Sequence, residues 1–292
     1  SGDLVKQLND LRLYSDTNHC LARLRDGLVP PTAAPPVTFH AYWRGRFGPK
    51  QALSVRSVLA TQAGARVHLR LDAQDGFEGH ETLPDLAPLL DRVKVSVCDP
   101  QAEVNAMRLP VRIDGNDTHQ ADAFRLLALH QEGGVYFDLD VVFLRDLGPL
   151  RNLGPFCYQW SGEPHANNAV LYLEAVSKLT TQILKRCRKK RSFRPWEVLR
   201  KDAGELRDLL LLPCAFFDPL WLRFDGHDPE AHVPFSHFDS FFNTSEDASP
   251  AAVDERFFPG AFAYHWHNRW DAKEEEGSWF SALQSRFAQD EV

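Results

Sequence analysis

Two aspartates stand inside an apolar stretch near the middle of the chain. Asp138 and Asp140 interrupt residues 135–144, whose other side chains are all aliphatic or aromatic. A continuous apolar run of this kind predicts a central strand that is covered on both faces. Side chains two residues apart in a strand point to the same side. We therefore expect the two carboxylates to converge while Leu139 points into the core.

The chemistry that this acidic pair suggests is cation binding. Neighbouring ionised carboxylates repel each other, and burial increases the free-energy cost of keeping both charged. A divalent cation bound by oxygens of both carboxylates offsets that cost, so the pair predicts a metal site. The alternative is a strand end at which both acids are solvated.

The helix expected before the pair carries a third acid and a base. Helical spacing predicts a helix over residues 118–132 that is stopped by Gly133 and Gly134. Asp122 and Arg125 lie three residues apart and so share one face of it. Because the helix leads directly into the acidic strand, we expect both side chains beside the acidic pair. There Arg125 contacts a phosphate or orients a carboxylate, whereas the alternative is an ordinary ion pair within the helix.

The elements that must position these residues alternate between strand and helix. The patterns predict strands at residues 37–43, 66–71 and 93–97, with helices at residues 50–62 and 86–90 between them. This order is typical of an α/β sheet with crossover helices. Beyond the acidic pair, the patterns predict strands at residues 156–160 and 169–173 and helices at residues 176–191 and 279–288.

Composition excludes several classes of protein. The 292 residues are 43% hydrophobic and 25% charged, which is typical of a globular chain and unlike a disordered or collagen-like one. The net charge of −7 argues against a nucleic-acid partner. Five cysteines without a CxxC pair are too few for a disulfide scaffold. Residues 1–36 are predicted to be a helical lead-in and a connector with four prolines in its last eight residues, and a domain is expected over residues 37–292.

The residues from Asp122 to Asp140 resemble the DxD sugar-binding region of glycosyltransferases. They contain Asp122 and Arg125, then the paired glycines, Tyr136 and the Asp-Leu-Asp pair, all within about twenty residues. The pattern is similar to glycosyltransferase family 32 and to the α-1,4-galactosyl/N-acetylglucosaminyltransferase group, with the large clostridial glucosylating toxins as more distant relatives. Three further segments resemble parts of that family, and together they extend the resemblance over residues 37–280: residues 39–43, residues 211–219, and residues 263–267 with Ser278-Trp279.

The resemblance implies a GT-A fold, which is a Rossmann-like single α/β domain with a mixed central sheet. It implies transfer of a hexose from a nucleotide-sugar donor, with a UDP-sugar favoured, with Mn²⁺ or Mg²⁺ as cofactor and with retention of anomeric configuration. The nucleotide-sugar-binding half would be residues 37–145 and the acceptor-binding half residues 146–292. The acceptor would be a glycan, a glycolipid or a protein.

The resemblance also implies roles for individual residues. Asp138 would contact the ribose and sugar of the donor, and Asp140 would bind the metal together with His265 or, alternatively, His267. The remaining donor-binding residues would be Asp122 and Arg125 at the sugar, Trp43 at the base, Asn168 near the donor, and Trp279. For Asn167 and Asn168 the alternative is a turn at the start of a strand.

The proline-rich connector suggests a location for the protein. We expect a Golgi lumenal domain behind a removed N-terminal membrane anchor, and the alternative is a cytoplasmic enzyme with free thiols.

Two other classes of function remain open. Haloacid-dehalogenase-like phosphatases also carry an Asp-x-Asp motif, with Asp138 as nucleophile and Asp140 as acid/base. That motif is expected near the start of the chain, with a further acidic pair downstream, and neither feature is present here. The third class is a non-catalytic sugar-binding module on the same fold.

Overall fold

The computed structural model describes residues 36–73, 84–160, 165–200, 206–224 and 233–289. The predicted lead-in and connector, apart from Pro36, lie outside these residues. Among the described residues no helix is long and apolar enough to cross a membrane.

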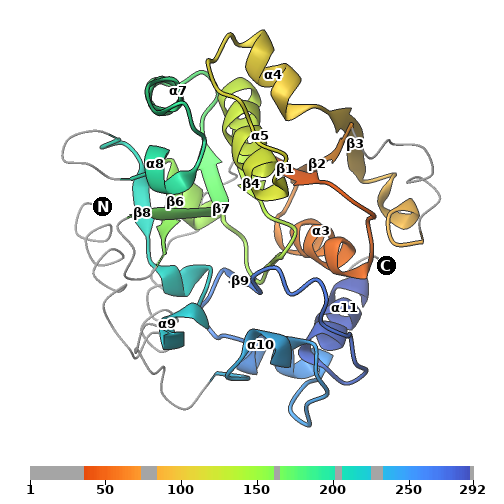
Figure 1. Ribbon diagram of the computed structural model, residues 1–292. Helices are drawn as coiled ribbons and strands as arrows, with labels where there is room; N and C mark the ends of the chain where they lie inside the picture. The colour runs from red at the N-terminus through yellow and green to blue at the C-terminus, as the bar shows by residue number, and fades with distance from the viewer. Residues whose placement is uncertain (1–35, 74–83, 161–164, 201–205, 225–232, 290–292) are drawn as a thin grey trace.

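A seven-stranded mixed sheet forms the centre of the molecule (Figure 1). Its strand order is β3 (Val93–Cys98), β2 (Arg66–Asp72), β1 (Thr38–Trp43), β4 (Gly134–Phe137), β7 (Ala166–Leu173), β6 (Phe156–Gln159) and β8 (Leu210–Leu212). The first four strands are parallel, β7 is antiparallel to both of its neighbours, and β8 is parallel to β6. The α/β sheet with crossover helices is therefore confirmed.

Helices cover both faces of the sheet. Helix α3 (Pro49–Thr61) packs Ala52, Val55 and Val58 into the core that includes Phe39 and Leu69. Helices α5 (Asp117–Glu132) and α7 (Lys178–Lys190) share a second core with Tyr136 and Leu171 on the opposite face. Helices α4 (Pro100–Ala106) and α8 (Pro195–Val198) also contribute to this second core, whereas η3 (Ala87–Leu89) and α6 (Gly148–Arg151) contribute to the first.

The C-terminal part of the chain builds a third core from aromatic side chains. It contains α11 (Trp279–Gln289), which packs beside α3 at the lower right of Figure 1. The other elements of the C-terminal part are α9 (Trp221–Phe224), η5 (Phe238–Phe241), η6 (Pro250–Ala252), α10 (Val253–Arg256), β9 (Ala263–His265) and η4 (Cys214–Phe216), the last of which packs in the first core. Strand β9 is antiparallel to β5 (Val141–Phe143), and these two strands form a small separate sheet.

The prediction of one continuous strand over residues 135–144 is wrong. Strand β4 ends at Phe137, and the Val141 amide then donates to the Asp138 carbonyl at 3.0 Å, which closes a turn. The chain resumes as β5, which pairs with β9 rather than with the central sheet. Leu139 is buried in the core as expected. The two aspartates therefore lie in a turn between two sheets, where different segments of the chain can reach each of them.

Candidate active site

A cleft opens where β1 and β4 end, and it contains both aspartates. Its volume is about 520 Å³. The side chains around it come from the end of β1, the start of α5, the turn after β4 and the segment after β9: Tyr42, Trp43, Arg44, Asn116, Asp117, Thr118, Ala121, Arg125, Asp138, Leu139, Asp140, Asn268 and Trp270. Segments far apart in sequence thus meet at the acidic turn, as the sequence predicted for Trp43, Arg125 and the aspartates.

Asp138 is held by side chains of α5 and β4. The Arg125 guanidinium contacts both carboxylate oxygens, each at 3.2 Å. The Tyr136 hydroxyl donates to Oδ1 at 2.6 Å. Burial raises the pKa of Asp138, while the charge of Arg125 and the Tyr136 hydrogen bond oppose that rise. These two contacts fix the orientation of the carboxylate and favour its ionised form.

Arg125 uses its donors entirely on the protein's own groups. The side chain is 2% exposed, and its Nη1 also donates to the carbonyl and to the side-chain oxygen of Asn168, at 2.7 and 2.9 Å. Its Nε donates to the Ala121 carbonyl at 3.1 Å. Of the two roles predicted for Arg125, this geometry favours orientation of a carboxylate over contact with a phosphate.

Asn168 and Asp122 complete the same network. The Asn168 amide donates to Asp122 Oδ1 at 2.9 Å, and Asp122 lies 3.5 Å from the Arg125 guanidinium. Asn167, by contrast, accepts from the Ala169 amide at 2.8 Å. Both asparagines lie inside β7 rather than in the turn that was the alternative interpretation. Asp122 Oδ2 is buried and has no hydrogen-bond partner among the described residues. Asp122 also lines a second cavity, of about 210 Å³.

Asp140 is held by the segment that follows β9. Its Oδ2 lies 3.1 Å from His265 Nε2 and accepts from the Asn268 amide at 2.8 Å. That amide is presented by a tight turn in which His267 and Asn268 both adopt left-handed φ values, 52° and 55°. Such values are uncommon for residues other than glycine. The turn is therefore shaped around the Asp140 carboxylate.

Asp140 and His265 shift each other's pKa in opposite directions. Burial raises the pKa of Asp140, but the charge and hydrogen bond of His265 outweigh it and lower this pKa to about 2. Burial lowers the pKa of His265, and Asp140 outweighs that effect and raises it to about 9. A carboxylate and an imidazole on adjacent segments are a donor set that Mn²⁺ accepts. The residues present therefore fit the predicted metal.

Asp218 is a site residue that sequence reasoning missed. It is fully buried, and its Oδ2 lies 2.8 Å from His267 Nε2 and 3.9 Å from His265 Nδ1. The ligand atoms of these three residues lie within 4.8 Å of one another, which is close enough for a shared cation. The signal for Asp218 was a single acid after two phenylalanines in residues 211–219, a segment already matched to the family.

His267 lies against Asp218 rather than Asp140. Its ring stacks on His265 with 3.8 Å between centroids, and burial lowers its pKa. Of the two alternatives for the metal-binding histidine, the contact with Asp140 favours His265.

Two tryptophans flank the cleft, and only one of them was predicted. Trp43 packs against Trp270 with 4.7 Å between ring centroids, and its Nε1 donates to the Arg46 carbonyl at 3.1 Å. Trp279 is not brought to the cleft: it is 1% exposed and packs on Phe257 in the third core. The residue of the closing segment that lies at the cleft is thus Trp270, because the chain between His267 and Ser278 folds back over the end of β1.

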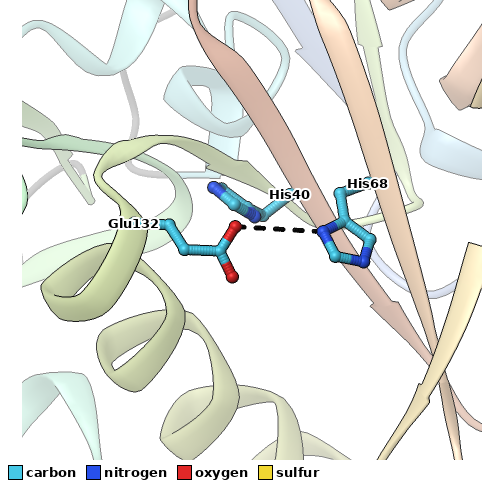
Figure 2. A group of neighbouring side chains, drawn as sticks. All are labelled: His40, His68 and Glu132. Atoms are coloured by element: carbon cyan, nitrogen blue, oxygen red, sulfur yellow. Dashed lines mark ion pairs between the residues drawn. The ribbon is translucent and has the colours of Figure 1, made fainter. Parts of the chain in front are cut away.

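A second group of titratable residues lies beneath the end of α5, and none of it lines the cleft. Figure 2 shows His40 of β1, His68 of β2 and Glu132 of α5, whose ligand atoms lie within 4.8 Å of one another. The Arg70 guanidinium already supplies a positive charge to this group. It pairs with Glu132 and donates to His40 Nδ1 at 3.0 Å. His40 in turn bonds the Gly133 carbonyl at 2.8 Å. This group therefore anchors the end of α5 on the sheet.

Comparison with known proteins identifies the segment that holds the site. Residues 80–158 match the family model described as a glycosyltransferase sugar-binding region containing a DXD motif. The match includes α5, β4 and both aspartates. The predicted resemblance is therefore confirmed, and the GT-A prediction of an α/β fold with a mixed central sheet agrees with the strand order. No curated protein sequence matches the chain.

Several solved glycosyltransferase structures are similar to this chain at low sequence identity. The galactosyltransferase LgtC in complex with donor and acceptor sugar analogs is 14% identical, with 86% of this chain and 95% of that chain covered and a TM-score of 0.46. GlyE of Streptococcus pneumoniae TIGR4 is 12% identical, with 88% and 64% covered and a TM-score of 0.49. The PaToxG glycosyltransferase is 18% identical, with 65% and 69% covered and a TM-score of 0.41.

Proposed function

We propose that the protein is a metal-dependent retaining glycosyltransferase that moves a hexose from a nucleotide diphosphate sugar, with UDP-hexose favoured, to a hydroxyl group of an acceptor. One observation carries the proposal. Asp138 and Asp140 lie in an open cleft, inside the segment that matches the DXD sugar-binding family, and each is fixed by its own set of partners. Such fixed carboxylates are expected where a ligand must be held in one geometry.

The metal would be held by Asp140 and His265, with Asp138 beside them. When bound, the cation neutralises charge that develops on the departing diphosphate. The protein's own groups do the rest. Arg125 and Tyr136 keep Asp138 oriented toward the cleft, and the Asn268 amide holds Asp140 in place.

The donor would lie between the tryptophans and α5. Trp43 stands at the mouth of the cleft, where an aromatic ring can stack on a nucleotide base. Asp122 lines the neighbouring cavity rather than this cleft, so its role at the cleft is to pair with Arg125. Arg125 has no donor left for the sugar, so its contribution is to hold Asp122 and Asp138. The acceptor would enter from the half of the domain formed by residues 146–292.

The geometry disfavours a phosphatase. A phosphatase nucleophile needs a free carboxylate oxygen, whereas both oxygens of Asp138 are engaged by Arg125 and one also by Tyr136. A non-catalytic binding module would hold a metal with the same residues, so donor turnover is the property that distinguishes it from an enzyme.

A donor panel tests the proposal. UDP-galactose, UDP-glucose, UDP-N-acetylglucosamine and GDP-mannose are incubated with the protein, with Mn²⁺ and with EDTA, and nucleotide release is measured. We expect Mn²⁺-dependent release of UDP from at least one donor, and none from the Asp140→Asn variant. Cleavage of p-nitrophenyl phosphate without any donor turnover would favour a phosphatase, and binding of a donor without turnover would favour a binding module.

A further inference from the structure

A row of aromatic rings runs from the candidate active site to the surface. It starts at His267, which lies 4.6 Å from Trp221 between ring centroids. Trp221 lies 5.1 Å from Trp160, Trp160 lies 5.8 Å from His165, and His165 lies 6.3 Å from Trp196. Trp160 is also nearly parallel to the His267 ring, at 11° and 6.4 Å. The row is thus continuous from the residues beside Asp140 to Trp196, which is 44% exposed.

Two rings of this row lie outside the hydrophobic cores. Trp160 and Trp196 belong to none of the three cores that the described residues form, whereas Trp221 packs against the first and the third. The Trp160 Nε1–H is buried and has no acceptor among the described residues, but the same is true of Trp266 and Trp279 in the third core. The case for a ligand therefore rests on the position and composition of the row.

The residues of the row come from the half of the chain that the resemblance assigns to the acceptor. Trp160 follows β6, His165 precedes β7, and Trp196 lies on α8, all within residues 146–292. Helix α8 also borders the cavity that Asp122 lines. Glu197 and the preceding Arg194 line that cavity too, and the Arg194 guanidinium lies 5.6 Å from the Trp196 ring.

We propose that this row is the acceptor subsite and that it takes an oligosaccharide of two or more sugars. This inference rests on the proposed function. Tryptophan rings offer a flat apolar face and a polar edge, which suits a sugar ring that has an apolar face and hydroxyls at its rim. The reacting sugar lies at the His267 end, and the following units extend over Trp160 toward Trp196.

The composition of the row favours a glycan over a lipid chain. The row contains two imidazoles and ends beside the Arg194 guanidinium, so each indole has a polar side chain next to it. Among the described residues, the other exposed large hydrophobic side chains are Val97 and Val176, on β3 and before α7. No exposed aliphatic side chain among the described residues therefore extends the row, as a lipid tail would require.

Matched acceptors of different length test the inference. The probes are p-nitrophenyl galactoside against lactoside, glucoside against cellobioside, and N-acetylglucosaminide against chitobioside, with the donor found by the hydrolysis panel. We expect the disaccharide of at least one pair to have the lower KM. Trp196→Ala should raise that KM about tenfold, toward the monosaccharide value, and leave donor hydrolysis unchanged.

Two variants separate stacking from general damage to the fold. Trp196→Phe keeps an aromatic face and should retain most of the disaccharide preference, whereas Val97→Ala, on the opposite edge of the sheet, should change neither KM. A disaccharide KM that is unaffected by Trp196→Ala would overturn the inference. The inference would also be overturned if donor hydrolysis proceeds but the sugar is transferred to a peptide or to none of the glycosides. In these outcomes the proposed function would stand. Absence of donor hydrolysis in the unmodified protein would instead contradict the proposed function, and the inference with it.

Discussion

Replacing Arg125 by methionine tests whether the acidic site depends on one buried cation. The guanidinium is 2% exposed and contacts Asp138 twice at 3.2 Å, Asp122 at 3.5 Å and Asn168 twice. Methionine has a similar reach but carries no charge, so it leaves two carboxylates without their counter-ion. Removal of one partner from a buried ion pair costs about 3–5 kcal/mol. For a domain of this size that corresponds to a fall in Tm of roughly 10 °C.

The same replacement should abolish activity through Asp138. Burial already raises the pKa of Asp138, and Arg125 is the main opposing influence. Without Arg125 the pKa of Asp138 should rise further and its orientation should be lost, so Mn²⁺-dependent donor turnover should fall at least a hundredfold. The free energy of unfolding is measured by urea denaturation, and turnover by nucleotide release.

Two further variants make the Arg125 test specific. Arg256→Met removes an exposed pair in which the arginine lies 2.6 Å from Asp247, and it should cost less than about 1 kcal/mol. In the double variant Arg125→Met/Asp138→Asn, the neutral amide no longer needs a cation, so about 2 kcal/mol of the loss should be recovered. The reasoning is refuted if Arg125→Met is no more destabilising than Arg256→Met, or if Asp138→Asn recovers nothing.

Three more outcomes are expected. Trp43→Ala should weaken UDP binding by about tenfold through lost stacking on the base, and unchanged affinity in a calorimetric titration would remove Trp43 from the base site. Gly134→Ala should destabilise the protein by more than about 2 kcal/mol, because φ is +104° and the new Cβ meets the Thr38 carbonyl oxygen. The control is Gly115→Ala, which has open space around the new Cβ and should cost far less. Equal midpoints of urea denaturation for the two variants would contradict this prediction. Burial, together with the charges of Arg70 and Lys94, lowers the pKa of His68 to about 4, below the 6.5 of the unfolded chain. The unfolded state therefore binds more protons as pH falls from 6.5 to 4, and stability that is fully present above pH 6.5 is lost by up to about 3 kcal/mol. His68→Gln should flatten that loss in urea titrations at pH 4–7, and an unchanged slope would show that His68 does not cause it.

Much of the nucleotide-binding half could be predicted from local pattern. Strands β1, β2 and β3 and helices α3 and α5 have period-two or helical spacing, and their predicted bounds agree with the structure to within about two residues. The helix that ends at the paired glycines brought Asp122 and Arg125 to the acidic turn, because a helix followed directly by a strand has only one way to return to the sheet.

The break at Asp138 could not be predicted in this way. Residues 135–144 are apolar on both sides of the aspartates, so their pattern fits one strand as well as two. The turn depends on partners far away in sequence, since Arg125 holds Asp138, while His265 and Asn268 hold Asp140. Only tertiary contacts decide this choice.

The closing segment shows the same limit. The family resemblance implied Trp279, whereas Trp270 reaches the cleft, because the chain folds back after His267 in a turn with two left-handed residues. Neither residue is a glycine, so the sequence carried no sign of that turn. Asp218 carried only a weak sign, a single acid in an apolar segment.

The central claim is that the acidic turn binds a cation that in turn holds a nucleotide diphosphate. The most direct measurement is calorimetric titration of UDP into the protein, with Mn²⁺ and with EDTA, for the unmodified chain, Asp140→Asn and the surface control Asp247→Asn. We predict that Mn²⁺ tightens UDP binding at least tenfold in the unmodified protein and in Asp247→Asn, and that this gain is absent in Asp140→Asn. Equal affinity with Mn²⁺ and with EDTA, or a full gain in Asp140→Asn, would contradict the account.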